Sequence, residues 1–329
     1  MSATRPRSDL VPKTCTVGDF LAHADVATSF ELVDAGLDTT RLLTHPRIQK
    51  SGLVLVGHMV GLVPTRIQVL GETEMSYLGE LPADERAHRI DHLMAQDLSL
   101  VVVTRGLEIP VELSAAALRS RTPVARSSLR SSRAIQVMQG ALDRLLAPET
   151  QIHGVLIDIH GVGTLLTGPS GIGKSECALF LVERGHRLVA DDQVVLSRLP
   201  PAQLWGTAPT LLRNHLELRG IGIVNVRDLY GAAAVRERKL VQLCVELCPW
   251  GEDEDDYERL GLVRRTRSYL DVSIPLLRIP VRPGRDMAVI LEVAARNHLL
   301  QKAGHHAAKK FVESLEASLG IRNPTDEEG

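Results

Sequence analysis

The sequence is poor in aromatic residues: four Phe, four Tyr and two Trp make up only 3% of its 329 residues. It therefore offers few side chains for the stacking surfaces on which single-stranded nucleic acids bind. A formal net charge of −2 supplies no general attraction to phosphate backbones either. The sequence also lacks an apolar run long enough to span a membrane, and no apolar stretch follows its basic first residues as in a secretory signal. We thus expect neither nucleic acid nor a membrane as a partner.

Cysteine is scarce as well. The four cysteines, Cys15, Cys177, Cys244 and Cys248, are too few and too scattered for a disulfide framework. Cys244 and Cys248 lie four residues apart, but no second pair with zinc-site spacing follows them. We therefore expect reduced thiols and a cytoplasmic location.

The sequence does contain enough apolar residues, 44%, for two hydrophobic cores, and its length is typical of two domains. We place the boundary so that the domains are residues 1–134 and 135–329. A basic, serine-rich stretch at 119–133 precedes this boundary. It is interpreted as a solvated linker or the N-cap region of the next helix, with an anion-attracting strip between domains as the alternative.

The first domain shows an alternating α/β pattern. Apolar, β-type runs predict buried strands at 51–58 and 98–104, whereas helical spacing predicts helices at 16–23, 83–96 and 111–120. No catalytic motif occurs in this part of the sequence, so we expect it to have a regulatory or assembly role.

The second domain contains a P-loop pattern, in which glycines let successive backbone N–H groups converge on phosphate oxygens. Lys174 can reach the outer phosphates, and the Ser175 hydroxyl can bind Mg²⁺. A β-type run leads into the loop and a helical pattern leads out of it, which is the context that a P-loop requires. The predicted nucleotide-binding residues are Gly168, Pro169, Ser170, Gly171, Ile172, Gly173, Lys174 and Ser175.

Two β-type runs, 154–159 and 162–167, precede the loop, and the short connection between them permits a hairpin but not a crossover. If the turn centres near Gly161, His153 falls opposite Ser170, beside the phosphate loop. The alternative is that His153 begins a strand and faces solvent. The residues leave both interpretations open.

Further carboxylates follow the P-loop. The run at 186–190 ends in Asp191 and Asp192, and adjacent strand residues point to opposite faces. We therefore expect one of the pair to face the nucleotide, where it can hold Mg²⁺ or act as a base. The run at 216–226 contains two glycines and Glu217. Its pattern favours a strand with a bulge over a flexible segment that presents Glu217 to a metal.

Two later segments contain arginines suited to binding phosphate. Arg259 follows an acidic stretch, which is typical of a solvated loop. The segment 280–285 contains two arginines between prolines and a glycine, and it is either a surface turn or an anion-binding loop. Helical patterns follow at 286–304 and 307–319, and an acidic tail that we expect to be frayed follows Pro324.

Together these segments resemble the bacterial HPr kinase/phosphorylase family. The resemblance is strong over residues 125–304, and its motifs occur in the family's order. It implies an α/β fold with an N-terminal α/β domain and a C-terminal P-loop kinase domain resembling phosphoenolpyruvate carboxykinase, assembled as a hexamer. It also implies a bifunctional enzyme of carbon catabolite control. Such an enzyme phosphorylates a serine of the phosphocarrier HPr with ATP or pyrophosphate, and it removes that phosphate by phosphorolysis. The motifs occupy residues 153–158, 168–176, 184–192, 216–225, 258–261 and 280–285.

The resemblance further implies roles for single residues. Asp192 matches the general base of phosphorylation, which acts as the acid in the reverse reaction, and Ser175 and Glu217 match Mg²⁺ ligands. The other catalytic matches are His153, Lys174 and Arg259. The segment implied in both reactions is Leu216, Glu217, Leu218, Arg219, Gly220, Ile221, Gly222, Ile223, Val224 and Asn225. The loop tied to phosphorolysis is Pro280, Val281, Arg282, Pro283, Gly284 and Arg285.

The sequence departs from the family pattern at two positions and leaves other functions open. Pro169 stands where many relatives have an acidic residue, and His160 stands where tyrosine is common. A small-molecule kinase on the same scaffold would turn over ATP without HPr. A nucleotide-gated regulatory protein would need the P-loop but not Asp192, Glu217 and Arg259 together, so this combination favours an enzyme.

Overall fold

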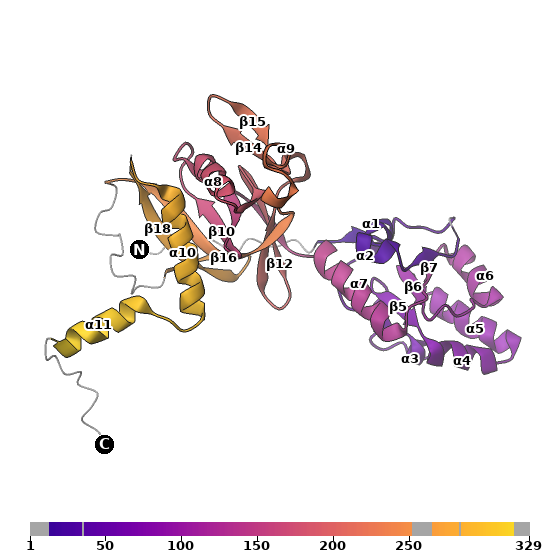
Figure 1. Cartoon of the computed structure of the whole chain (residues 1–329). Helices are drawn as coiled ribbons and strands as arrows, with labels where there is room; N and C mark the ends of the chain where they lie inside the picture. Colours follow the sequence, from indigo (N-terminus) through magenta and orange to yellow (C-terminus); the bar gives the residue numbers. More distant parts are fainter. Residues whose placement is uncertain (1–12, 35, 252–264, 283, 319–329) are drawn as a thin grey trace, which may run out of the picture. The chain divides into compact units, whose positions relative to one another are not determined.

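The computed structural model consists of two compact units that meet between residues 148 and 149 (Figure 1). The boundary predicted at 134–135 lies too early. The helix α7 (Ser131–Leu145) packs Met138 and Leu142 into the core of the first unit, because its apolar residues recur along the face that meets the sheet. The structure describes residues 13–34, 36–251, 265–282 and 284–318.

The first unit is a five-stranded sheet with helices on both faces. Strands follow the order β2-β7-β6-β5-β4, in which the last four are parallel and β2 is antiparallel to its neighbour. The strands, including the separate β1–β3 pair, are β1 (Cys15–Thr16), β2 (Glu31–Leu32), β3 (Leu42–Leu43), β4 (Gln49–Lys50), β5 (Ile67–Leu70), β6 (Leu100–Val103) and β7 (Val124–Arg126). The helices besides α7 are α1 (Val17–Ala22), α2 (Ala24–Ala27), α3 (Gly52–Leu55), α4 (Glu72–Glu80), α5 (Ala83–Met94) and α6 (Val111–Ser120).

Two cores cover the faces of this sheet, and β6 serves both. Leu100 and Val102 pack toward α1, α2 and α7, whereas Val101 and Val103 pack toward α3, α4, α5 and α6. A strand buried on both faces must be apolar throughout, which explains the continuous run that predicted it.

The strand predicted at 51–58 is wrong, because these residues form α3. Val54 and Leu55 are buried while Leu53 and Val56 on either side are exposed, which is the burial pattern of a helical turn rather than the alternation of a strand. Short apolar runs leave this choice open in a sequence. The predicted helices at 16–23, 83–96 and 111–120 are confirmed as α1, α5 and α6.

The second unit is built on a mixed sheet of nine strands. Its main path is β11-β9-β10-β16-β13-β12-β8, and the long β16 also pairs with β18, which pairs with β17. The strands are β8 (Glu149–His153), β9 (Val155–Ile159), β10 (Val162–Thr167), β11 (Arg187–Ala190), β12 (Gln193–Leu199), β13 (Gln203–Thr207), β16 (Arg238–Pro249), β17 (Arg265–Tyr269) and β18 (Val272–Val281). A separate hairpin is β14 (His215–Leu218) and β15 (Gly222–Asn225). The helices are α8 (Lys174–Glu183), α9 (Val226–Tyr230), α10 (Met287–Lys302) and α11 (Ala307–Ser318), with short 3₁₀ turns at Thr210–Leu212 and Ala232–Ala234.

The predicted hairpin before the P-loop is confirmed, but its register differs. Ile159 pairs with Val162, so the turn consists of His160 and Gly161, both with positive φ (50° and 84°). A two-residue turn with this backbone matches the right-handed twist of the strands that it joins. The pairing predicted from a turn centred at Gly161 is wrong, and His153 is not paired with β10 at all.

Among the described residues, the four cysteines are buried and form no disulfide, and no helix combines the length and apolarity needed to cross a membrane. The buried thiols contribute to packing.

An ion-pair network around the buried Glu292 ties the end of α8 to α10. The Glu292 carboxylate on α10 accepts two hydrogen bonds from Arg184, at 3.0 and 2.8 Å, and lies 2.8 Å from Nε2 of His186. Glu292 is only 7% exposed. The Arg184 hydrogen bonds, with those of His186, hold the pKa of Glu292 at about 2, below its ordinary value of 4.5.

Replacing Glu292 by Gln should lower the free energy of unfolding at neutral pH by about 3 kcal/mol, because Arg184 and His186 lose their shared carboxylate. A carboxyl group whose pKa is lowered by folding stabilises fully above its unfolded pKa, and this contribution disappears as the pH falls toward the folded pKa. In urea unfolding experiments, the difference between the unmodified protein and the variant should therefore shrink between about pH 5 and about pH 3. The exposed Glu313, 3.8 Å from Lys309, provides the control: Glu313→Gln should change stability little at any pH. A pH-independent difference for Glu292→Gln would contradict this assignment.

Candidate active site

A small cavity of about 110 Å³ lies where β10 ends and α8 begins. It gathers side chains from four separate segments of the second unit, which are the P-loop, the β11–β12 connection, the β14–β15 hairpin and the end of β8. The residues that line it include His153, Lys174, Ser175, Asp191, Asp192, Glu217 and Arg219.

The P-loop has the backbone that its glycines permit. Gly168 has a φ of 141°, and a Cβ added there would lie 2.3 Å from the carbonyl oxygen of Leu247 on β16. Gly173 has a φ of 98° and caps the N-terminus of α8. Side chains at either position would move the loop. The N-terminus of α8 therefore opens into the cavity with free backbone N–H groups, as phosphate binding requires.

Lys174 lies at the base of this loop. It is only 6% exposed, and its Nζ donates to the carbonyl oxygens of Gly168 at 3.1 Å and Pro169 at 2.9 Å. Burial lowers the pKa of Lys174, while the charges of Asp191 and Asp192 act in the opposite direction. The ammonium group is thus held beside the space that a phosphate would take.

Asp191 and Asp192 both line the cavity, so the prediction that only one of them faces it is wrong. Asp192 has a φ of 62°, so the strand has already turned and the alternation of side chains no longer applies. Asp191 is buried, and it accepts hydrogen bonds from the Ser175 hydroxyl at 2.8 Å and from the Glu217 backbone N–H at 3.0 Å. Burial raises the pKa of Asp191, and these hydrogen bonds oppose the rise.

Asp192 is the more accessible of the two carboxylates. Its side chain is about half exposed, and Oδ1 lies 3.0 Å from Nδ1 of His153. His153 reaches the site because β8 pairs with β12, which places it beside Gln193, the residue after Asp192. The imidazole is therefore at the site, as one of the two sequence interpretations had it, but through a different strand from the one predicted.

The segment 216–225 is a hairpin in which Leu216 pairs with Val224 and Leu218 pairs with Gly222. Leu216 and Leu218 are buried in the core, so Glu217 points to the opposite face and lines the cavity. The favoured interpretation of a bulged strand is therefore wrong: the segment is a regular hairpin, and its strand β14 presents the Glu217 carboxylate. Arg219 lies in the turn after β14 and also lines the cavity, and its guanidinium lies 2.8 Å from a Cβ added at Gly171. Sequence reasoning gave Arg219 no role apart from its membership of the segment 216–225.

The loop that includes 280–285 borders a second cavity of about 600 Å³. Val281, Gly284 and Arg285 line this cavity, which shares Gly173 and Glu176 with the first one. The Arg282 guanidinium lies 5.0 Å from the ring centre of Trp250. Part of this loop is therefore adjacent to the P-loop. Pro283 and Arg259, both predicted site residues, lie outside the described residues.

The arrangement combines the parts that phosphoryl transfer needs. Backbone N–H groups and Lys174 can bind phosphate, and an accessible carboxylate, Asp192, can accept a proton from a hydroxyl group. Ser175, Asp191 and Glu217 line the same cavity and carry hydroxyl and carboxylate oxygens, the hard ligands that Mg²⁺ prefers.

Comparisons with known proteins agree with this chemistry. The family model described as "HPr Serine kinase N terminus" matches residues 16–142, and "HPr Serine kinase C-terminal domain" matches residues 144–315. The HPr kinase/phosphorylase of Geobacter sulfurreducens is 42% identical over 93% of this chain and 96% of its own. The protein of the same name from Bacillus subtilis is 43% identical over 88% and 94%. The solved structure titled "Structure of the Hpr(Ser) kinase/phosphatase from Coxiella burnetii" is 33% identical, with a TM-score of 0.45, over 49% of this chain and 98% of its own. The chain therefore belongs to the HPr serine kinase family.

Proposed function

We propose that the chain is a bifunctional HPr kinase/phosphorylase, which phosphorylates a serine of HPr from ATP and removes that phosphate by phosphorolysis. One observation supports this most directly: the accessible Asp192 carboxylate lies in the same cavity as the P-loop lysine. A nucleotide-binding module alone needs the loop but not this carboxylate.

In the forward reaction the serine hydroxyl of HPr would approach Asp192. Asp192 would take the proton as the serine oxygen forms a bond to the γ-phosphorus of ATP and the bond from that phosphorus to the leaving oxygen of ADP breaks. Lys174 and the N-terminus of α8 would bind the phosphate oxygens on which charge accumulates. His153 beside Asp192 would orient the carboxylate.

Phosphorolysis would run through the same groups. An oxygen of inorganic phosphate would attack the phosphorus of phosphoserine, the bond to the serine oxygen would break, and Asp192 would return a proton to that oxygen. The products would be HPr and pyrophosphate. The resemblance ties the segment 280–285 to this direction, and its described residues adjoin the P-loop, which supports that role.

Mg²⁺ fits the donors in this cavity. Ser175, Asp191 and Glu217 would hold it, where it would neutralise phosphate charge. The resemblance implies Ser175 and Glu217 for this role, and Asp191 joins them through the Ser175 hydrogen bond. Arg259 as a catalytic residue, pyrophosphate as an alternative donor, the hexamer, the cytoplasmic location and the carboxykinase-like fold stay predictions.

The test is to incubate the purified chain with HPr, Mg²⁺ and ATP and to follow the mass of intact HPr. We expect a gain of one phosphate on a serine. Addition of inorganic phosphate, after removal of ATP, should reverse the gain and release pyrophosphate. ATP turnover that is the same without HPr would instead indicate a small-molecule kinase. Binding of ATP without any turnover would indicate a nucleotide-gated regulatory protein.

A further inference from the structure

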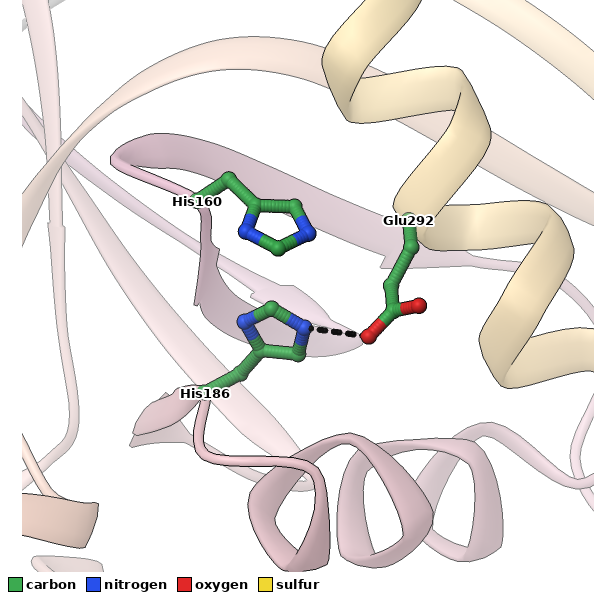
Figure 2. A group of neighbouring side chains, drawn as sticks. All are labelled: His160, His186 and Glu292. Atoms are coloured by element: carbon green, nitrogen blue, oxygen red, sulfur yellow. Dashed lines mark hydrogen bonds and ion pairs between the residues drawn. The ribbon is translucent and has the colours of Figure 1, made fainter.

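A second group of ligating side chains lies at the far end of β10 from the P-loop. His160 lies in the β9–β10 turn, His186 precedes β11, and Glu292 lies on α10. Figure 2 shows the three side chains pointing toward one another, with a hydrogen bond between His186 and Glu292. Because β10 has six residues, about 20 Å of strand separates this cluster from the phosphate loop. The cluster is therefore distinct from the candidate active site.

The geometry is compact. One ligand atom from each residue lies within 4.8 Å of the other two, and the imidazole rings meet edge to face with their centres 4.6 Å apart. Donors around a tetrahedral Zn²⁺ lie about 3.3 Å apart, given metal–ligand distances of about 2.0–2.1 Å. On metal binding, the distance of 2.8 Å between His186 Nε2 and Glu292 Oε1 would lengthen slightly. The side chain of His160 would rotate toward the other two ligands.

His160 is suited to that adjustment. It is exposed and lies in a tight turn, whereas His186 and Glu292 are buried and fixed by packing. With His186 and Glu292 fixed and His160 able to move, three protein ligands leave at least one coordination position of the metal open to water. Two imidazoles with one carboxylate suit a borderline transition metal such as Zn²⁺ or Co²⁺ and not Mg²⁺, which prefers oxygen ligands.

Two arginines contact these donors. Arg184 donates to both oxygens of Glu292, and the Arg296 Nε donates to the His160 Nε2 at 3.1 Å. In the latter contact the His160 Nε2 accepts the hydrogen bond, and it does so through the lone pair that a metal ion would take.

We propose that His160, His186 and Glu292 form a binding site for a borderline divalent transition-metal ion, for which Arg296 is the built-in competitor. Metal binding displaces the Arg296 guanidinium from His160 while Arg184 retains its hydrogen bond to the second oxygen of Glu292. The bound ion cross-links the β9–β10 turn, the start of β11 and α10. The site requires neither nucleotide nor HPr, so it does not depend on the proposed function.

The test uses untagged, chelator-treated protein titrated with Co²⁺, followed by its visible absorption, and with Zn²⁺ in competition with a chromogenic chelator. We expect one ion per chain and an increase in the thermal unfolding midpoint when Zn²⁺ is present. His160→Gln is the main variant, because the exposed position tolerates it, and it should weaken binding at least about tenfold and abolish the thermal shift. Arg296→Gln should instead tighten binding, by up to about tenfold, because it removes a competing positive charge.

A double variant of the tandem histidines, His305→Gln with His306→Gln, is the control for adventitious binding to surface imidazoles. It should bind Zn²⁺ as tightly as the unmodified protein does. The proposal is overturned if the unmodified protein shows no saturable binding, if His160→Gln binds equally well, or if the double variant loses the binding. It is also overturned if Arg296→Gln binds more weakly, since the arginine would then support the site rather than compete for it.

Discussion

Replacing Asp192 by Asn should reduce both the phosphorylation of HPr and the phosphorolysis of its phosphoserine by at least about a hundredfold. The amide has the shape of the carboxylate, but it cannot take the serine proton in one direction or return it in the other. The rates of both reactions should therefore fall together, as expected for a single group that serves as the base in one direction and as the acid in the other. The measurement is the initial rate of HPr mass change in each direction.

Binding of ATP should survive this substitution. Asp192 is half exposed and lies beside the phosphate loop, so its negative charge opposes the phosphates rather than holding them. We expect Asp192→Asn to bind ATP at least as tightly as the unmodified protein. The loss should accordingly be found in kcat and not in KM.

The backbone offers a matched control for this variant. Asp192 has a left-handed φ of 62°, a conformation that asparagine adopts as readily as aspartate does. Asp271 has a φ of 60° in the β17–β18 turn and is also exposed, so Asp271→Asn makes the same chemical change outside the cavity. This control should keep full activity. An Asp192→Asn enzyme that retained more than about a tenth of either rate would exclude Asp192 as the proton acceptor.

Local patterns predicted the P-loop well because its parts are contiguous. Gly168, Gly173, Lys174 and Ser175 lie within eight residues, and the strand and helix that flank them carry their own signals. The hairpin before the loop was predictable for the same reason: only His160 and Gly161 separate its strands.

Features that depend on pairing between distant segments were predicted poorly. His153 reaches Asp192 because β8 pairs with β12, across a stretch that contains the whole P-loop and α8. No local pattern reports that pairing. The deep position of Asp191 depends similarly on Ser175 and on the Glu217 backbone, which belong to other elements. The cluster of His160, His186 and Glu292 is the extreme case, because three elements far apart in the sequence bring it together.

The domain boundary shows a further limit of reading along the chain. The helical pattern that begins near residue 134 was correct, but periodicity does not say which sheet its apolar face covers. Met138 and Leu142 pack against the first unit's sheet, so the helix belongs to the unit that precedes it. The composition of the sequence predicted the domain boundary at the basic, serine-rich stretch. The packing of α7 places that boundary after this helix.

Replacing Lys174 by Met should have an effect as large as that of Asp192→Asn but of a different kind. Methionine fills similar space in the buried position and removes only the ammonium group that donates to the Gly168 and Pro169 carbonyl oxygens. We expect ATP affinity and both transfer rates to fall, with the rates lower by about 10²–10³-fold, because the charge serves both the bound phosphates and the transition state. Equilibrium dialysis of ATP and the HPr mass assay measure the two losses separately.

Lys309→Met is the control for the loss of a positive charge, because Lys309 is exposed on α11 and pairs only loosely with Glu313 at 3.8 Å. It should leave ATP binding and both rates unchanged. If Lys174→Met binds ATP normally, the ammonium group does not contact the phosphates of the bound nucleotide, and the cavity described above is not where they lie. If instead Lys174→Met loses ATP affinity and Asp192→Asn does not, binding and proton transfer are divided between the two residues as the site geometry implies. The two side chains line one cavity from different segments, so this division would assign phosphate binding to the loop and proton transfer to the carboxylate within a single site.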